Sequence, residues 1–332
     1  AYAAAGLAAG LGYVLPVMVY QVHYELQFPF DNRLVLVGFA VLLGLAGLGA
    51  RLPSREPDRR SLAAWPAPVS VLAALLLLVP LALVVTRPAV PAPDQAGGTI
   101  RLMSWNLMYG RDPVRGDVDL AAVAAVVEQV DPDVLVLQEV ARGWPIGGGV
   151  DMAEWLSRRL QMRYAWAPAA NRQFGNALFT RLPHSDVEVE RLPFGQGPME
   201  RSYLSTTLRL ADGQQLRLVN THLQHRKENS PTRLAQTDAL LAAWDGAPGT
   251  VIAGDFNFWP SWQEADRWKA AGFVSAQDVT GHGAEFTVPS YDPDNRVDWI
   301  FGTPDLRFSD FAILSQVTAS DHFPLVVTVQ VG

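Results

Sequence analysis

Hydrophobic residues are distributed in two different ways along this 332-residue chain. Before about residue 87 they form long stretches without any charge, at Ala1–Val22, Leu34–Ala50 and Ser61–Thr86. A helix needs about 20 apolar residues to cross the hydrocarbon core of a bilayer. This pattern therefore predicts about three transmembrane helices, at residues 1–22, 34–52 and 66–86. Three buried helices of a globular protein are the alternative, although core helices normally keep one polar face.

From Thr99 onward the hydrophobic residues occur in short runs separated by polar turns. Alternating or β-branched runs of this length are typical of strands. We expect strands at Arg101–Leu107, Val134–Val140, Asn176–Thr180, Tyr203–Leu210, Gln215–Leu223, Thr250–Asp255, Val297–Phe301 and Leu325–Val331.

Helical spacing and capping residues predict helices between these strands. Leu120, Val123, Val127 and Val130 repeat at helical spacing after Asp117, which can cap the helix. A second helix is expected at Asp151–Gln161. Ser230 as the N-cap, followed by Pro231 at the first helical position, opens a third helix, which runs to about Trp244. The capping box Ser261–Glu264 opens a fourth. Strands alternating with helices predict an α/β or α+β layered domain.

A segment rich in Pro, Ala and Gly, Arg87–Gly98, lies between the two parts of the chain. Such a composition gives a semi-rigid tether without a core of its own. The predicted organisation is a transmembrane region at 1–87, a linker at 88–98 and a globular domain at 99–332. The chain opens Ala-Tyr-Ala-Ala inside an apolar segment, so we expect a fragment of a longer membrane protein with further spans upstream.

Charges in the connecting loops predict the orientation. Four arginines separate the second and third spans, Arg51, Arg55, Arg59 and Arg60, and basic loops tend to stay cytoplasmic. Everything after Arg87 would then lie on the extracytoplasmic face. Arginines outnumber lysines 24 to 2 and alanine is abundant, as in products of GC-rich genomes, so we expect an integral protein of a bacterial plasma membrane.

Composition excludes several classes of function. The globular domain carries 20 Lys and Arg against 28 Asp and Glu, a formal charge of −8. It therefore lacks the overall basic footprint of a nucleic-acid binder, with a local basic groove as the alternative. The absence of cysteine excludes disulfides and a thiol nucleophile. No G-x-S-x-G elbow, Walker A loop or dinucleotide fingerprint occurs.

Polar residues recur where the predicted strands end. Glu139 ends the run DVLVLQE, and Asn106 follows LMSW. Each is either a solvated strand end or turn residue, or an oxygen ligand for a hard cation such as Mg²⁺. Asp255 and Asn257 stand two residues apart and would face the same side of an extended segment, where a carboxylate could activate water. An Asx-turn is the alternative for this pair.

Two histidines are candidates for binding or protonating a phosphate oxygen. His222 ends one predicted strand, and His322 directly follows Asp321. A lone histidine is more often structural, but Asp298 could orient the ring of His322. A carboxylate beside an imidazole raises its pKa and favours the charged form.

The ordered segments SWN, LQE, GNALFT, NTHL, GDFN, RVDWIF and SDHFPL resemble the endonuclease/exonuclease/phosphatase (DNase I-like) superfamily. The resemblance spans Thr99 to the C-terminus. It implies a four-layer sandwich of two mixed β-sheets flanked by helices, with the active site at one edge.

The resemblance also implies a role for each matching residue. Asn106 and Glu139 would hold Mg²⁺, with Asp321 near it and Mn²⁺ or Ca²⁺ as alternatives. Asp255 would position or deprotonate the attacking water, and Asn257 would orient the water or the phosphate. His222 and His322 would bind phosphoryl oxygens, His322 paired with Asp298. Asn176 and Arg201 are candidates for phosphate contact, with a surface or structural salt bridge as the alternative for Arg201.

Uncharged spans fused to this domain are faintly similar to the C-terminal part of membrane proteins that remodel GPI-anchor lipids. This similarity lies in the arrangement and in the loop YELQFPFDNRL. A tether raises the effective concentration of lipid headgroups at the site. We therefore expect a membrane-anchored, Mg²⁺-dependent phosphodiesterase that hydrolyses or transfers a lipid headgroup and has the bilayer as its partner. A tethered extracytoplasmic nuclease and a catalytically silent lipid-binding scaffold are the alternatives.

Overall fold

The computed structural model describes residues 97–332 except 145, 146 and 212. Before them it describes residues 12, 14–20, 29–31, 33–49, 75, 78–79, 82, 86 and 89–92. The chain divides into two compact units, and the larger one contains Pro91–Gly332. The two units are described separately.

The described residues of the N-terminal unit include one long helix, α2 (Arg33–Gly49), with 17 mainly apolar residues. Its position coincides with the middle predicted span. Among the residues that the structure describes, no helix has both the length and the apolar character needed to cross a membrane. The predicted spans at 1–22 and 66–86 lie largely outside the described residues.

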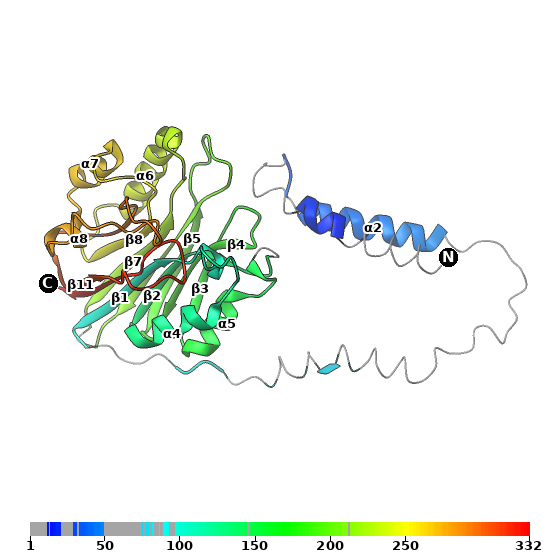
Figure 1. The fold of residues 1–332 in the computed structure, drawn as a ribbon, viewed down its shortest axis with the longest axis horizontal. Helices are drawn as coiled ribbons and strands as arrows, with labels where there is room; N and C mark the ends of the chain where they lie inside the picture. The colour runs from blue at the N-terminus through cyan, green and yellow to red at the C-terminus, as the bar shows by residue number, and fades with distance from the viewer. Residues whose placement is uncertain are drawn as a thin grey trace, which may run out of the picture. The chain divides into compact units, whose positions relative to one another are not determined.

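The larger unit is built on two six-stranded sheets (Figure 1). The first has the order β11 (Leu306–Ile313), β12 (Leu325–Val331), β1 (Thr99–Asn106), β2 (Val134–Ala141), β4 (Phe174–Thr180), β3 (Arg163–Ala169). The second has the order β5 (His184–Arg191), β6 (Ser202–Arg209), β7 (Gln215–His222), β8 (Thr250–Asp255), β10 (Asp298–Gly302), β9 (Val274–Ser275). Both are mixed, because β1–β2 and β7–β8 pair in parallel and the other neighbours are antiparallel.

Alternation along the central strands separates two hydrophobic layers. In β1, Ile100 and Leu102 join the core between the sheets, while Met103 and Trp105 join the core under the helices of the first sheet. Successive side chains of a strand point to opposite faces of its sheet. Each central strand is therefore buried on both faces, which explains its nearly continuous apolar sequence.

Helices cover the outer faces of both sheets. Their apolar residues enter the core of the first sheet from α4 (Leu120–Val130) and α5 (Met152–Leu160). On the second sheet they come from α6 (Ser230–Trp244) and α7 (Gln263–Ala270). The described residues of the unit also form a short helix, α8 (Ala276–Val279), and the 3₁₀ turns η1 (Met108–Gly110) and η3 (Lys227–Asn229). The expected arrangement of two mixed sheets flanked by helices is confirmed.

Three of the expected helix caps were wrong. Asp119, and not Asp117, caps α4 by accepting a hydrogen bond from the Ala122 amide. Ser230 is the first residue of α6, whose N-cap is Asn229. The N-cap of α7 is Trp262 without a side-chain bond. Glu264 does not complete a capping box because its carboxylate is paired with Arg233 at 3.0 Å.

A buried polar bridge joins the two sheets below the site. Asn220 of β7 donates hydrogen bonds to the carbonyls of Leu137 and Ala177, at 3.0 and 2.9 Å, and accepts one from Gln138 at 2.8 Å. These partners belong to β2 and β4 of the opposite sheet. The bridge fixes the edge formed by the ends of β2 and β7.

Candidate active site

Three neighbouring strands of the second sheet place functional side chains side by side. Asp255 ends β8, and its backbone is in register with His222 of β7 and with Asp298 of β10. All three side chains are at most 3 % exposed. Sequence positions far apart therefore meet at one edge, as expected from the strand endings.

Both oxygens of the Asp255 carboxylate are held by hydrogen bonds. Oδ1 accepts from the backbone amide of Asn257, and Oδ2 accepts from the side-chain amide of Asn106, both at 2.9 Å. His222 Nε2 lies 3.3 Å from the same Oδ2. Burial raises the pKa of Asp255 to about 6, and the positive His322 and the two amides oppose the rise only in part. The carboxylate is thus fixed in direction and basic enough to accept a proton near neutral pH.

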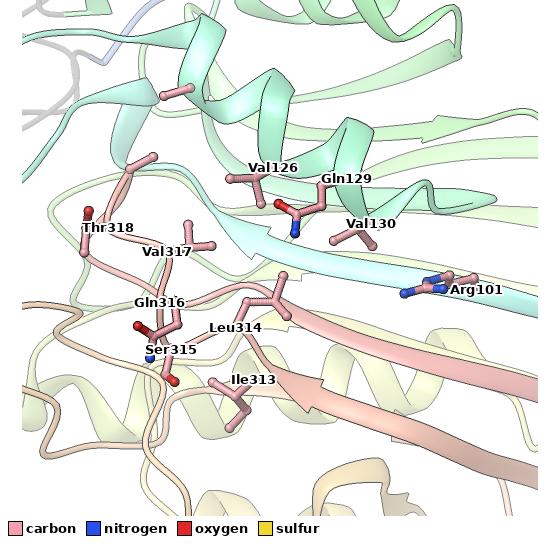
Figure 2. A pocket seen from close by; sticks show the side chains of 12 residues that line it. Arg101, Val126, Gln129, Val130, Ile313, Leu314, Ser315, Gln316, Val317 and Thr318 are labelled. Atoms are coloured by element: carbon pink, nitrogen blue, oxygen red, sulfur yellow. The ribbon is translucent and has the colours of Figure 1, made fainter.

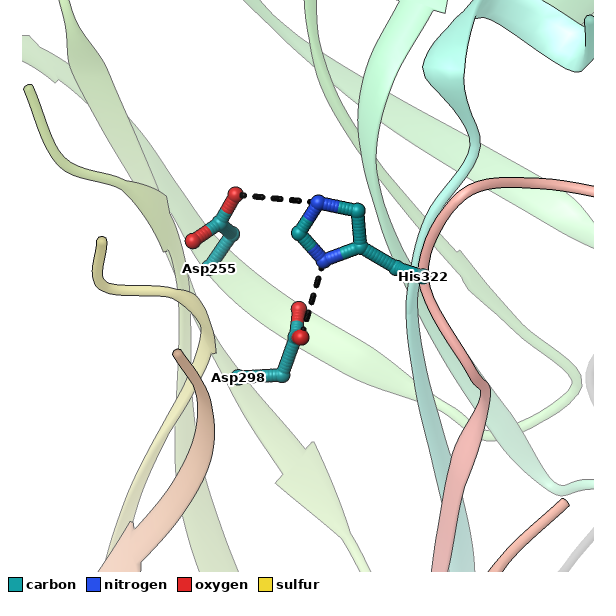
Figure 3. Close-up of side chains that lie close together, drawn as sticks. All are labelled: Asp255, Asp298 and His322. Atoms are coloured by element: carbon teal, nitrogen blue, oxygen red, sulfur yellow. Dashed lines mark hydrogen bonds and ion pairs between the residues drawn. The ribbon is translucent and has the colours of Figure 1, made fainter. Parts of the chain in front are cut away.

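His322 lies between two carboxylates (Figure 3). Its Nδ1 is 2.8 Å from Asp298 Oδ2, and its Nε2 is 3.9 Å from Asp255 Oδ2. Burial alone would lower the pKa of His322, but the bond to Asp298 and the nearby carboxylates raise it well above 6.5. The ring is therefore an imidazolium, and the proton on Nε2 is beyond hydrogen-bond distance of both Asp255 and Asp321, the latter at 4.0 Å.

In contrast to His322, the ring of His222 is neutral. Arg201 lies 2.9 Å from His222 Nδ1, and a guanidinium can only donate. Nδ1 is therefore the acceptor, and the single proton of the ring is on Nε2, facing Asp255. Burial and the positive charge of Arg201 lower the pKa of His222 well below 6.5. His222 is a neutral donor, while His322 is a cationic one.

Arg201 is 2 % exposed, so the alternative of a surface salt bridge was wrong. Its second terminal nitrogen lies 3.2 Å from Nδ1 of His225. Burial and Arg201 lower the pKa of His225 to about 4. His225 was not predicted from the sequence, although a second histidine three residues after His222 was a visible signal.

Glu139 has an unusual backbone. It lies at a bulge between Leu137 and Val140 of β2 and has a φ of 54°. Bulges bend a strand and redirect one side chain. Asn106 ends the parallel neighbour β1, directly beside Gln138, and Ser320 Oγ donates to the Asn106 carbonyl at 2.7 Å. The bulge and this bond bring Glu139 and Asp321 to the end of β1.

This group of oxygens fits a divalent cation. Within the described part of the chain, no hydrogen bond or ion pair reaches the Glu139 carboxylate. Burial and the charge of Asp321 raise its pKa to about 7, with smaller effects of Arg201 and His322 in the opposite direction. Two carboxylates and the Asn106 amide oxygen are hard ligands suited to Mg²⁺. A cation there would relieve the repulsion between Glu139 and Asp321.

A second set of atoms is also close enough for a metal, since Asp255, Asp298 and His322 lie within 4.8 Å of one another. The imidazolium of His322 already neutralises these carboxylates, and a cation would have to displace its proton. The oxygens of Glu139, Asn106 and Asp321 are therefore the better donor set for a cation, and this ligand set, which the family resemblance implies, stays a prediction.

Asn257 and Asn176 differ from expectation in geometry. Asn257 has a φ of 53° outside β8, so it does not share a strand face with Asp255. The pair forms the Asx-turn, and the Asn257 amide group donates to the Leu223 carbonyl at 3.2 Å. Asn176 is buried and donates to the Ser202 carbonyl at 3.0 Å, which ties β4 to β6. Phosphate contact by Asn176 stays a prediction.

Tyr109 was not expected in the site. It has a left-handed backbone with a φ of 48° and packs edge-on against Trp144 at 5.1 Å between ring centroids. Burial and the charges of Glu139 and Asp321 raise its pKa. Its position three residues after Asn106 was the only sequence signal.

A cavity of about 650 Å³ lies outside this constellation (Figure 2). It is bounded by α4 and by the loop Ile313–Ala319 that leads toward Ser320. None of the predicted site residues lines it.

Residues 103–322 match the model of the Endonuclease/Exonuclease/phosphatase family. The chain belongs to this family. The matched segment contains every site residue named above. Members of the endonuclease/exonuclease/phosphatase family are phosphodiesterase or nuclease hydrolases that generally use a divalent metal.

Individual relatives are distant. A UPF0294 protein from Vibrio vulnificus is 26 % identical over 244 residues, 70 % of this chain and 77 % of that protein. A 5′-tyrosyl-DNA phosphodiesterase from Caenorhabditis briggsae is 29 % identical over 155 residues, 45 % of this chain and 40 % of that enzyme. A crystal structure of an endonuclease/exonuclease/phosphatase from Beutenbergia cavernae superposes with a TM-score of 0.62 at 24 % identity, covering 70 % of this chain and 72 % of that one. That likeness supports the fold.

Proposed function

We propose that the protein is a metal-dependent phosphodiesterase in which a water molecule attacks phosphorus in line with the leaving group. The observation that carries the proposal is the Asp255 carboxylate, which Asn106, Asn257 and His222 hold from both sides at a shared strand edge. A divalent cation held by Glu139, Asn106 and Asp321 would neutralise phosphate charge and polarise a phosphoryl oxygen.

The residues of the chain have separate tasks in this reaction. Asp255 accepts the proton of the attacking water, and its pKa of about 6 suits that task near neutral pH. His322 donates from Nε2 to a phosphoryl oxygen while Asp298 keeps the ring charged and oriented. Neutral His222 donates from Nε2, with Arg201 fixing its tautomer. Positioning and charge neutralisation of this kind supply most of the catalysis in phosphoryl transfer.

For the substrate we propose the phosphodiester of a lipid headgroup, with hydrolysis or transfer to a lipid hydroxyl as the outcome. A globular domain of charge −8 disfavours a polyanionic substrate, and the uncharged segments before residue 87 favour attachment to a bilayer. The domain would then be tethered by 88–98 on the extracytoplasmic face of a bacterial plasma membrane. The alternative is cleavage at a DNA end, which the 5′-tyrosyl-DNA phosphodiesterase relatives favour.

The test compares two substrates with one preparation. The full chain is assayed with Mg²⁺ for release of headgroups from phospholipid vesicles and for nicking of plasmid DNA. We expect headgroup release that EDTA and the Glu139→Ala change abolish, with plasmid DNA left intact. Efficient DNA cleavage with intact lipids would overturn the lipid assignment. Lipid turnover that Glu139→Ala and Asp255→Ala leave unchanged would show that the chemistry does not occur at this site.

A further inference from the structure

Exposed aromatic side chains are concentrated around the active edge. In the part of 97–332 that the structure describes, four aromatic side chains are more than a third exposed, and three of them lie in segments attached to the site. These are Trp259, Phe286 and Tyr291, at 42, 48 and 64 % exposure. The fourth, Trp155, lies on α5 at 37 %. Exposed rings that gather at one place usually mark a binding surface.

Trp259 is presented by a rigid stack. It follows Asp255 by four residues and stacks on Trp262, with ring centroids 5.4 Å apart and an interplanar angle of 19°. The Arg233 guanidinium lies 5.0 Å from the Trp262 ring centroid. Arg233 is itself buried and paired with Glu264. Trp262 and the Arg233–Glu264 pair hold the inner side of this stack. The ring of Trp259 is therefore already ordered, and its remaining surface is exposed to solvent.

Phe286 and Tyr291 lie in a segment that is hydrogen-bonded to site residues. Thr287, next to Phe286, accepts hydrogen bonds on Oγ1 from the amides of Val297 and Asp298. Ser290, next to Tyr291, donates from its amide to the Asp321 carbonyl at 2.7 Å. Both exposed rings are therefore fixed to segments that carry site residues.

The charge beside these two rings is negative. The segment 284–295 contains three carboxylates, Glu285, Asp292 and Asp294, and no Lys or Arg. Glu285 lies 2.8 Å from Nδ1 of His282, which leaves Asp292 and Asp294 as the carboxylates without an ion pair among the described residues. Carboxylates there repel a nucleic-acid backbone and an anionic bilayer. They attract an ammonium group, and aromatic faces bind ammonium groups by cation–π interaction. Aromatic rings are also favoured at the membrane interface.

We propose that Trp259, Phe286 and Tyr291 form a surface that docks onto zwitterionic phospholipid headgroups bearing an ammonium group. This inference rests on the proposed function and specifies its substrate class. The rings enter the headgroup layer around the site, so that a headgroup phosphate reaches Asp255 while its ammonium group contacts the carboxylates.

The test uses the full chain with Trp259, Phe286 and Tyr291 all changed to alanine, and Trp155→Ala as the matched control. We expect the triple variant to lose roughly tenfold in kcat/KM on phosphatidylcholine vesicles. Its turnover of soluble bis(p-nitrophenyl) phosphate should equal that of the wild type. The Trp155→Ala control should match the wild type on both substrates. Absence of all turnover of the soluble diester by the wild type would count against the proposed function, separately from the docking.

A second measurement tests docking without turnover. Brominated phosphatidylcholine should quench tryptophan fluorescence of the wild type more than that of Trp259→Phe, and brominated phosphatidylglycerol should not separate the two. Equal quenching of both proteins, or equal vesicle turnover by the triple variant and the wild type, would overturn the proposal. A loss of activity confined to DNA substrates would identify the surface as a nucleic-acid contact and overturn it as well.

Discussion

At the scale of single residues, the two histidines of the site differ in charge because they have different hydrogen-bond partners. His222 faces an obligate donor, Arg201, and is neutral, whereas His322 faces Asp298 and is charged. The sequence predicted the pairing of His322 with Asp298, because the carboxylate begins one strand and the imidazole lies just before another. It did not predict the neutral state of His222, since that state depends on a guanidinium 21 residues away.

Glu139 should destabilise the metal-free fold at high pH. Its folded pKa of about 7 exceeds the ordinary value of 4.5, so the cost of ionisation appears as the pH rises through this range. We expect Glu139→Gln to stabilise the protein in EDTA at pH 8 by about 1–3 kcal/mol, with a smaller gain at pH 5. Denaturant titrations at both pH values measure this difference.

The same stabilities measured with Mg²⁺ complete this test. At pH 8 Mg²⁺ should stabilise the wild type but not Glu139→Gln, because the variant lacks the carboxylate ligand. The exposed residue Glu190 serves as the control, and Glu190→Gln should behave as the wild type. A gain for Glu139→Gln that is the same at pH 5 and pH 8 would contradict the assignment.

The Asp298–His322 pair should control the alkaline side of the pH profile. The raised pKa of His322 keeps the ring charged, and activity that needs the imidazolium is lost as the pH rises through that raised value. We expect Asp298→Asn to move this loss to lower pH and to reduce kcat by about 10²-fold at pH 8. The exposed Asp310→Asn serves as the control for kcat across the pH range, and an unshifted alkaline limb in Asp298→Asn would contradict the role of the pair.

At the scale of elements, the sequence predicted the central strands and missed the edges. All eight expected strands exist, and Thr250–Asp255 and Leu325–Val331 have the expected bounds. The four missed strands, β3, β5, β9 and β11, are the outer strands of the two sheets. Edge strands are less buried and carry charge or proline, as in HSDVEVER of β5 and RYAWAPA of β3. Their pairing depends on neighbours that their own sequences do not reveal.

The bulge at Glu139 was equally invisible, because it arises from the register of β2 against β4. The capping errors have the same origin. The sequence Ser261–Glu264 matches the capping-box pattern, but the Glu264 carboxylate pairs with the buried Arg233 instead of with the helix N-terminus.

The hydrogen bonds of Asn220 between the two sheets should contribute to the free energy of unfolding. Asn220→Leu removes three buried hydrogen bonds and leaves the carbonyls of Leu137 and Ala177 without that donor. We expect a loss of about 2–4 kcal/mol in the free energy of unfolding, measured by denaturant titration. Gln215→Ala, at the exposed start of β7, should change it by less than about 0.5 kcal/mol. Equal stabilities of the two variants would show that the bridge is dispensable.

At the scale of the whole molecule, we propose that a phosphodiesterase site acts at a membrane surface. The domain charge of −8, the uncharged N-terminal segments and the aromatic rings around the site all favour a lipid over a nucleic acid. The sequence predicted the catalytic constellation because its members lie at the ends of strands, as His222 and Asp255 do, at the start of one, as Asp298 does, or just before one, as His322 does. It could not predict the aromatic surface, because exposure of a ring depends on the folded loops that carry it.

The most direct test of the central claim is hydrolysis of bis(p-nitrophenyl) phosphate by the full chain, the wild type compared with Asp255→Asn. We expect turnover that requires Mg²⁺ or Mn²⁺, disappears in EDTA and falls by about 10³-fold in Asp255→Asn. Turnover that persists in EDTA, or that Asp255→Asn leaves unchanged, would contradict it.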